Sequence, residues 1–202
     1  MLFVGKNMNP DLLTAAKGNS DHFERVTEWE APIRYALADT PKGTPVLEIG
    51  VQNGGSLLQL MGLIAEIDPT RQIYSVDVNP APKICEEWAV SLGVTVAHFQ
   101  MLQHDFVRKV VDWDELPSYF SYANFDADHS QSSCSADILE FIPFLVRGGV
   151  LVKDDVNQWD SVPDFPGMKR LDLYSLIDEG EGVGKGYSLS KHGHHTAAWQ
   201  KT

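Results

Sequence analysis

The stretch from Val46 to Asp77 limits the possible folds more than any other part of this 202-residue chain. Residues 46–49 form a short, mainly apolar run that is typical of a buried parallel strand, and three glycines within the next six residues permit a tight turn. Apolar residues then recur at helical spacing over 57–67, and residues 73–76 have the composition of a second strand. This order of strand, glycine turn, helix and strand indicates an open α/β sheet.

Asp77 stands at the carboxyl end of the second expected strand, 23 residues after Gly54. A carboxylate roughly 20 residues beyond the glycine turn is the group that binds ribose hydroxyls in sheets of this kind. We therefore expect a ligand that carries a ribose. The glycine spacing differs from the G-x-G-x-x-G pattern of nicotinamide-binding domains, which makes hydride transfer the weaker alternative.

The remaining chain keeps alternating between helix and strand patterns. We expect helices over 80–92, 105–111 and 136–146, and strands over 94–99, 122–125 and 150–153. An amphipathic segment follows at 168–177, and a hairpin formed by 186–190 and 196–200 closes the chain. The order predicts a doubly wound, mainly parallel seven-stranded α/β sheet with a C-terminal antiparallel hairpin.

We expect one domain over residues 1–202, with a sheet core over 46–202 and an N-terminal helical flank or lid over 1–45. In the flank, Asp21 and Glu24 have the spacing of a capping pair for one helix. Pro32 then starts or kinks a second short helix.

The composition excludes several classes of function. The net charge is −12 at pH 7, which disfavours nucleic acids and anionic membranes as partners, because binding phosphates requires clustered Lys and Arg. No apolar run reaches the length of a spanning helix and the N-terminus turns polar too soon for a signal peptide, so we expect a cytoplasmic protein. The two cysteines, Cys85 and Cys134, are expected to be free thiols. A homo-oligomer is compatible with the sequence.

Acidic residues follow two further expected strands. Asp128 comes shortly after the strand at 122–125, and Asp154 and Asp155 follow the strand at 150–153. Ligands bind at the carboxyl ends of the strands in a doubly wound sheet, so we expect these three carboxylates to converge. Close carboxylates repel one another unless a cation neutralises them, and oxygen ligands suit Mg²⁺ best, with Ca²⁺ or Mn²⁺ as alternatives. The competing interpretation is that they only cap helices or bind cofactor and solvent.

The chain resembles the class I S-adenosylmethionine-dependent methyltransferases in four segments: LEIGVQNGGSLL, SVDVN, FDADHS and GGVLVKDDVNQW. Within that class it is similar to the cation-dependent O-methyltransferases that act on catechols, caffeoyl-CoA or macrolide sugars, over about residues 44–160. The resemblance implies S-adenosylmethionine and a divalent metal as cofactors. It also implies that a hydroxyl of a small molecule accepts the methyl group.

The resemblance assigns a role to particular residues. The methionine and ribose parts of the cofactor would be surrounded by Glu48, Gly50, Gly54 and Ser56. Asp77 would bind the ribose hydroxyls, and Asp126 would lie at the cofactor. The metal would be held by Asp128, Asp154 and Asp155.

The chain departs from the family pattern at two positions. Gln52 stands where the general class often has a further glycine, although the cation-dependent members frequently lack that glycine. The catechol-type enzymes have a lysine base after the first metal aspartate, whereas His129 follows Asp128 here. An imidazole titrates near neutral pH, so His129 is the expected catalytic base. Asp126 is an alternative to Asp128 as the metal ligand, because some sugar methyltransferases place that carboxylate three residues before a histidine.

Two other interpretations stay open. One is a protein that binds S-adenosylmethionine without turnover, and the other is a metal-dependent relative with different chemistry, such as the cephalosporin hydroxylase-like proteins. Trp159 is expected either to pack in the interior or to form a wall of the substrate pocket. The histidines at 192, 194 and 195 are expected to be solvated, with metal binding or a contact to substrate as the alternatives.

Overall fold

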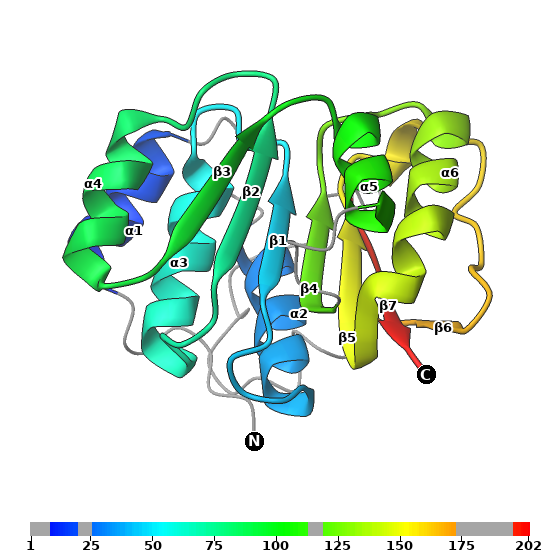
Figure 1. The fold of residues 1–202 in the computed structure, drawn as a ribbon, viewed down its shortest axis with the longest axis horizontal. Helices are drawn as coiled ribbons and strands as arrows, with labels where there is room; N and C mark the ends of the chain where they lie inside the picture. The colour runs from blue at the N-terminus through cyan, green and yellow to red at the C-terminus, as the bar shows by residue number, and fades with distance from the viewer. Residues whose placement is uncertain (1–8, 20–25, 113–118, 173–195) are drawn as a thin grey trace.

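A computed structural model of the chain describes residues 9–19, 26–112, 119–172 and 196–202. These residues form a seven-stranded sheet with helices on both faces (Figure 1). The strands are β1 (Val46–Ile49), β2 (Ile73–Asp77), β3 (Val96–Gln100), β4 (Phe120–Phe125), β5 (Leu145–Lys153), β6 (Met168–Arg170) and β7 (Ala197–Lys201). The helices are α1 (Pro10–Gly18), α2 (Val26–Asp39), α3 (Gly55–Ile67), α4 (Lys83–Leu92), α5 (Gln103–Asp112) and α6 (Gln131–Phe141).

The strand order is β3-β2-β1-β4-β5-β7-β6. Strands β1 to β5 run parallel to one another, and β7 is antiparallel to both β5 and β6. This is the class I methyltransferase arrangement of the Rossmann-like fold, so the predicted fold class is confirmed. The C-terminal segment supplies the antiparallel strand as expected, while 186–190 lies outside the described residues.

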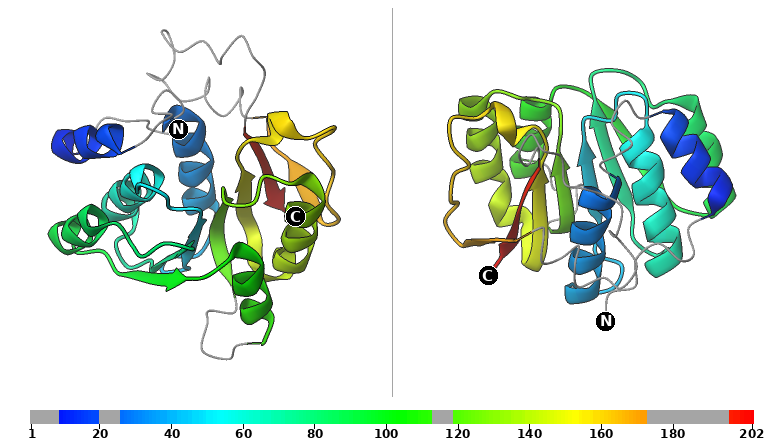
Figure 2. Two further views of the ribbon diagram at one scale, coloured as in Figure 1. Left: turned by 90° about the horizontal axis from the view of Figure 1, so that it is seen from above. Right: turned by 180° about the vertical axis from the view of Figure 1, so that it is seen from behind.

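Two apolar layers hold the helices on the sheet. Helices α2, α3 and α4 cover one face together with α1, and α5 and α6 cover the other (Figure 2). Side chains of one strand alternate between the layers: Val150 and Val152 pack with α2 and α3, and Leu151 packs with α6. Both cysteines are free and buried, as expected. Among the described helices, none combines the length and the apolar character that a membrane crossing requires.

Several predicted boundaries were wrong. The sequence predicted that Pro32 starts or kinks a second short helix. Residues 26–39 instead form one helix with Pro32 inside it. The helix predicted over 136–146 ends at Phe141, because Pro143 has no N–H with which to donate a further helical hydrogen bond. Strand β5 therefore begins at Leu145, earlier than predicted. Helix α1 was not predicted. The start of the amphipathic segment at 168–177 forms β6.

Arg71 fixes the end of the sheet opposite the carboxyl ends of the strands. Its guanidinium is buried and donates to Oδ2 of Asp68 at 2.9 Å and to Oγ1 of Thr40 at 3.1 Å. It also donates to the backbone carbonyls of Thr44, Leu37 and Thr40. Because every donor is used, this buried charge ties the end of α2 to the loops around β1 and β2.

Candidate active site

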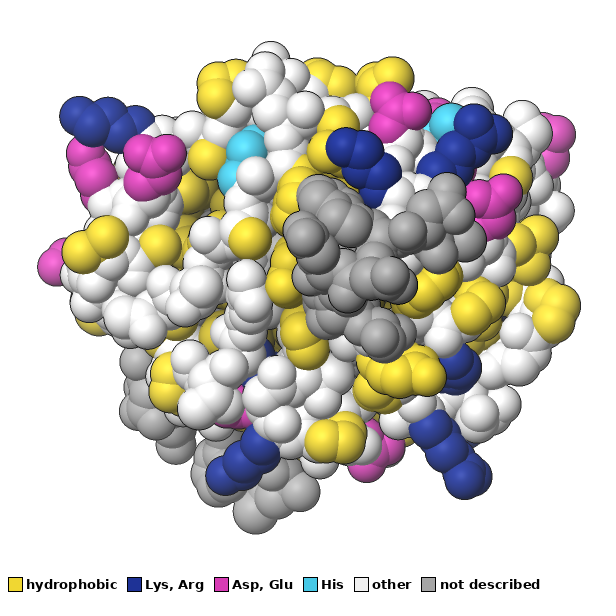
Figure 3. All heavy atoms as spheres, viewed as in Figure 1, with side chains coloured by type: hydrophobic (Ala, Val, Ile, Leu, Met, Phe, Trp, Pro, Cys, Tyr) yellow, Lys and Arg dark blue, Asp and Glu magenta, His cyan; other side chains and the backbone are white. Residues whose placement is uncertain are grey.

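A pocket of about 650 Å³ lies at the carboxyl ends of β1, β2, β3, β4 and β5. The segments after these five parallel strands meet there because parallel strands end at the same edge of the sheet. The lining residues are Ile49, Gly50, Gln52, Val76, Asp77, Val78, Met101, Leu102, Gln103, His104, Asp126, Ala127, Asp128, His129, Asp154 and Asp155. Lys and Arg side chains on the face in Figure 3 are scattered among Asp and Glu and form no single basic patch.

The Asp77 carboxylate holds the glycine turn after β1. Its Oδ2 atom accepts hydrogen bonds from the backbone N–H groups of Val51 and Gln52, both at 2.8 Å. Its Oδ1 atom accepts from the backbone N–H of Asn79 at 2.9 Å and from the Asn79 side chain at 3.1 Å. Burial acts to raise the pKa of Asp77, but these hydrogen bonds outweigh burial and hold its pKa below the ordinary value. Asp77 is therefore an anion that fastens the turn while lining the pocket.

The bond to Asp77 also explains how Gln52 can replace a glycine. Gln52 has a φ of +46°, in the left-handed region that favours glycine. Its N–H donates to Asp77, which stabilises this conformation.

Gly50 allows the loop after β4 to pack against the turn after β1 at the pocket floor. Its φ is +92°, and a Cβ atom placed on it would lie 2.2 Å from the carbonyl oxygen of Asp126. The next backbone atoms of that loop, up to the nitrogen of Ala127, would lie within 2.9 Å. Only glycine fits here. The loop that carries Asp126 is thus packed directly against the turn that Asp77 holds.

Two side chains of β3 hold the loop after β2. The Nε2 atom of His98 lies 2.9 Å from the carbonyl oxygen of Asn79, and Nδ1 lies 3.0 Å from Oγ of Ser75. A carbonyl can only accept, so Nε2 carries the proton and Nδ1 accepts from the Ser75 hydroxyl. Gln100 donates to the carbonyl of Val78 at 3.2 Å. This loop presents Val78 to the pocket.

Three of the predicted cofactor residues lie outside the pocket lining. Glu48 is buried under the pocket floor, and burial raises its pKa to about 7 despite hydrogen bonds from Ser56 and Asn124. Gly54 begins α3 and contacts Cys85, whose Sγ would lie 2.5 Å from an added Cβ. The predicted residues that do line the pocket are Gly50, Asp77 and Asp126.

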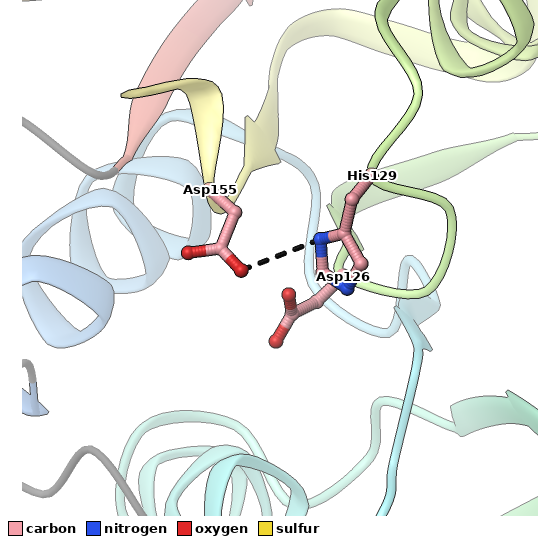
Figure 4. A group of neighbouring side chains, drawn as sticks. All are labelled: Asp126, His129 and Asp155. Atoms are coloured by element: carbon pink, nitrogen blue, oxygen red, sulfur yellow. Dashed lines mark ion pairs between the residues drawn. The ribbon is translucent and has the colours of Figure 1, made fainter. Parts of the chain in front are cut away.

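Asp126, His129 and Asp155 form one group at the pocket (Figure 4). Each offers one ligand atom, and these atoms all lie within 4.8 Å of one another. The Nδ1 atom of His129 lies 3.3 Å from Oδ2 of Asp155. The backbone of Asp155 has a φ of +57°, an uncommon conformation for a residue other than glycine. Two carboxylates and an imidazole are donors that divalent metals accept.

Asp126 is surrounded by negative charge. Burial and the neighbouring charge of Asp154 raise its pKa to about 8, with smaller contributions from Glu48 and Asp155, and the charge of Lys153 acts in the opposite direction. Like charges held this close disfavour one another. A cation bound among these carboxylates would relieve that repulsion.

The other two predicted metal ligands have partners of their own. Asp128 accepts a hydrogen bond from the backbone N–H of Ser130 at 2.9 Å, just before α6. Burial raises its pKa, but bonds to Ser133 and Ser130 outweigh burial and lower it. Asp154 accepts from Oγ1 of Thr196 at 2.8 Å. Asp126, the alternative to Asp128, is the residue that stands in the group with His129 and Asp155.

Sequence reasoning missed Lys153 and the part played by Trp159. Trp159 is buried and outside the pocket lining, so it packs in the interior. Its indole N–H donates to the carbonyl of His129 at 3.1 Å. The Lys153 side chain is fully buried, and its Nζ atom lies 6.0 Å from the centroid of the Trp159 ring. The sequence signal for Lys153 was a lysine placed between the apolar run at 150–152 and the aspartates at 154 and 155.

A second group on α5 and α6 was also missed. The buried Asp137 accepts from Nε2 of Gln103 at 2.7 Å and lies 2.8 Å from Nδ1 of His104. Gln103 in turn accepts from the backbone N–H of Asp128 at 3.2 Å. These contacts join the start of α5 to the loop after β4. Asp105 is exposed at the first turn of α5, outside the pocket lining.

Comparison with solved structures supports the fold. CalS11, a TDP-rhamnose 3′-O-methyltransferase of calicheamicin biosynthesis, has a TM-score of 0.56 and 16% identity, covering 98% of this chain and 96% of its own. The cofactor-bound protein Rv0187 from MTB has a TM-score of 0.56 and 16% identity, with coverages of 95% and 88%. The methyltransferase MycE of the mycinamycin pathway, in complex with Mg and SAH, has a TM-score of 0.51 and 16% identity. This chain is covered to 96% in that match but spans only 54% of MycE.

No curated protein matches the chain in sequence. A sequence family described as "Methyltransferase domain" matches residues 47–156, which run from β1 through the loop after β5 and include more than half of the chain. The matched segment contains Asp77, Asp126, His129 and Asp155. The chain belongs to this family of methyltransferase domains.

Proposed function

We propose that the protein transfers a methyl group from S-adenosylmethionine to a hydroxyl of a small molecule, with the help of a divalent metal. The observation that carries this proposal is the position of the Asp126, His129 and Asp155 group at the same pocket that Asp77 and Gly50 line. The residues that we propose for cofactor binding and those that we propose for metal binding thus line one cavity.

The pocket has the features that an adenosine group requires. Asp77 places an ionised carboxylate beside the glycine turn, where ribose hydroxyls can donate to it. Val78 and Leu102 are exposed apolar side chains on the pocket wall and can cover the faces of a planar base. When bound, S-adenosylmethionine supplies a methyl group on a positively charged sulfur.

Asp126 and Asp155 would hold the metal, with Asp154 beside them in the pocket. The charge around Asp126, which raises its pKa, fits a cation-binding role. A divalent metal supplies Lewis acidity, which lowers the pKa of a hydroxyl that it binds. Mg²⁺, Ca²⁺ and Mn²⁺ are the divalent ions that accept such oxygen ligands.

His129 would accept the proton of the acceptor hydroxyl. Its Nδ1 atom faces Asp155, so a proton on Nδ1 orients the ring and leaves Nε2 as the basic atom. The structural neighbour CalS11, a TDP-rhamnose 3′-O-methyltransferase, supports a hydroxyl as the acceptor. The neighbour MycE, solved with Mg and SAH, supports the metal and the cofactor.

The test is methyl transfer from S-adenosylmethionine labelled in its methyl group to a panel of catechols and sugars, with and without Mg²⁺. We expect transfer that EDTA abolishes. Replacing His129 by Gln should lower turnover by about 100-fold or more while Mn²⁺ still binds. Loss of Mn²⁺ binding in this variant would make His129 a ligand instead of the base.

Matched variants test the ligand assignment. Asp126→Asn and Asp155→Asn should abolish Mn²⁺ binding measured by calorimetry, whereas Asp128→Asn should leave it unchanged, because Asp128 is bonded at the start of α6. The opposite pattern would overturn the assignment. Cofactor binding without transfer to any acceptor would favour a protein that binds S-adenosylmethionine without turnover.

A further inference from the structure

Lys153 is the last residue of β5, and its side chain is fully buried. Its Nζ atom has no hydrogen-bond partner within the part of the chain that the structure describes. Removing an ammonium group from water without hydrogen bonds costs free energy, so such a group needs a compensating interaction. The face of the Trp159 ring lies 6.0 Å from Nζ and attracts it weakly. This attraction does not neutralise the positive charge of the ammonium group.

The compensating charges belong to the candidate metal site. Lys153 directly precedes Asp154 and Asp155 in the chain, and its charge acts on Asp126 against the effects of burial and of Asp154. Lys153 is absent from the pocket lining, which excludes it from contact with an acceptor or with the reacting proton. Lys153 therefore acts on the carboxylates of the site only through the electric field of its buried charge.

We propose that Lys153 is a fixed internal counter-ion that offsets part of the negative charge of this site. The inference rests on the proposed function. Asp126, Asp154 and Asp155 line the pocket, and the buried Lys153 side chain directly precedes two of them in the chain. Without Lys153 the site would carry one more net negative charge and would attract cations, trivalent ones above all, more strongly.

Calorimetric titrations with MnCl₂ and TbCl₃ test this inference without any acceptor. Lys153→Met keeps most of the length of the side chain and removes its charge, and it should bind Mn²⁺ about tenfold more tightly than the wild type. Its preference for Tb³⁺ over Mn²⁺ should also rise. Lys169→Met is the control, because it removes one charge from an exposed position on β6 and should leave both affinities unchanged.

Each outcome has a distinct meaning. Unchanged or weaker Mn²⁺ binding by a folded Lys153→Met variant would overturn the counter-ion role and leave the metal site standing. An absence of Mn²⁺ binding by both the wild type and this variant would overturn the metal site and the inference together. Lys153→Arg keeps the charge and should bind Mn²⁺ as the wild type does, which separates the effect of charge from that of altered packing. Thermal unfolding of each metal-free variant shows whether it is folded.

Discussion

The indole N–H of Trp159 donates a hydrogen bond to the backbone carbonyl of His129 at 3.1 Å. The loop after β4 is thereby fastened to the segment after β5, two stretches that are 30 residues apart. Gln131 strengthens this connection, because it donates to the carbonyl of Ser161 at 3.0 Å and accepts from the N–H of Asp160 at 2.9 Å. The two loops that carry the candidate metal ligands are thus held as one unit.

Trp159→Phe should loosen this unit, because it removes the N–H and keeps most of the ring. Loss of one buried hydrogen bond should lower the free energy of unfolding by about 1 kcal/mol. If that energy helps to place His129 and Asp155, Mn²⁺ binding should weaken up to about fivefold in calorimetry. Trp199→Phe is the matched control, since that indole donates to Pro163 at 3.2 Å, and it should lose similar stability with unchanged Mn²⁺ affinity. Equal Mn²⁺ affinities in both variants would argue against a positioning role for Trp159.

His98→Phe should weaken the binding of S-adenosylhomocysteine. The substitution removes the bond to the carbonyl of Asn79, so the loop that carries Asn79 and Val78 loses one of its two supports from β3. We expect a rise in Kd of about fivefold in calorimetry, which corresponds to about 1 kcal/mol. Ser75→Ala removes only the bond at Nδ1 of His98 and should have a smaller effect. A Kd of the wild-type value in His98→Phe would show that the loop needs no such support.

Gly50→Ala should destabilise the protein by about 3 kcal/mol or more, because the added Cβ would lie 2.2 Å from the Asp126 carbonyl oxygen at a positive φ. Gly93 is the comparison, since its φ is +68° and nothing lies within 4 Å of an added Cβ. Gly93→Ala should therefore lose only about 1 kcal/mol, the cost of the left-handed conformation. Chemical denaturation measures both values. Similar losses in the two variants would contradict the close packing of the loop after β4 against the turn after β1.

Glu48 makes the stability of the metal-free protein depend on pH. Burial raises its pKa in the folded state to about 7, above the ordinary value of 4.5, so the folded protein binds this proton more tightly than the unfolded chain does. Its contribution to stability is fully present below pH 4.5 and is lost as pH rises through 7. The loss amounts to at most about 3 kcal/mol. Glu48→Gln should be more stable than the wild type at pH 8, by a margin that shrinks towards pH 5 in thermal unfolding. A constant margin across this range would refute the pKa shift.

The position of Asp77 beside the glycine turn could be predicted because its determinants are local in the sequence. A strand, a glycine turn and a second strand place Asp77 beside the turn whatever the rest of the chain does. The boundary of β5 was harder, because Leu145 and Val146 suit a helix as well as a strand, and only the short 3-10 helix Ile142–Phe144, which contains Pro143, separates them from α6.

The metal half could be predicted only in part, because it depends on contacts between distant segments. Asp126 and Asp128 both follow β4. The alternation of side chains between the two faces of a strand does not predict where side chains point in a loop beyond the end of that strand. Asp128 turns to the start of α6, where Ser130 binds it, while Asp126 meets Asp155 across the pocket. The bonds of Trp159 and the burial of Lys153 likewise arise from packing that no short motif encodes.

The most direct test of the account is a calorimetric titration of S-adenosylhomocysteine into the wild-type protein and into Asp77→Ala. We predict a one-to-one complex with the wild type and binding weakened by at least about tenfold in the variant, because the variant loses the ionised carboxylate that holds the turn and that we propose binds the ribose. Absence of binding to the folded wild type at millimolar ligand, or equal affinity in the two proteins, would contradict the account.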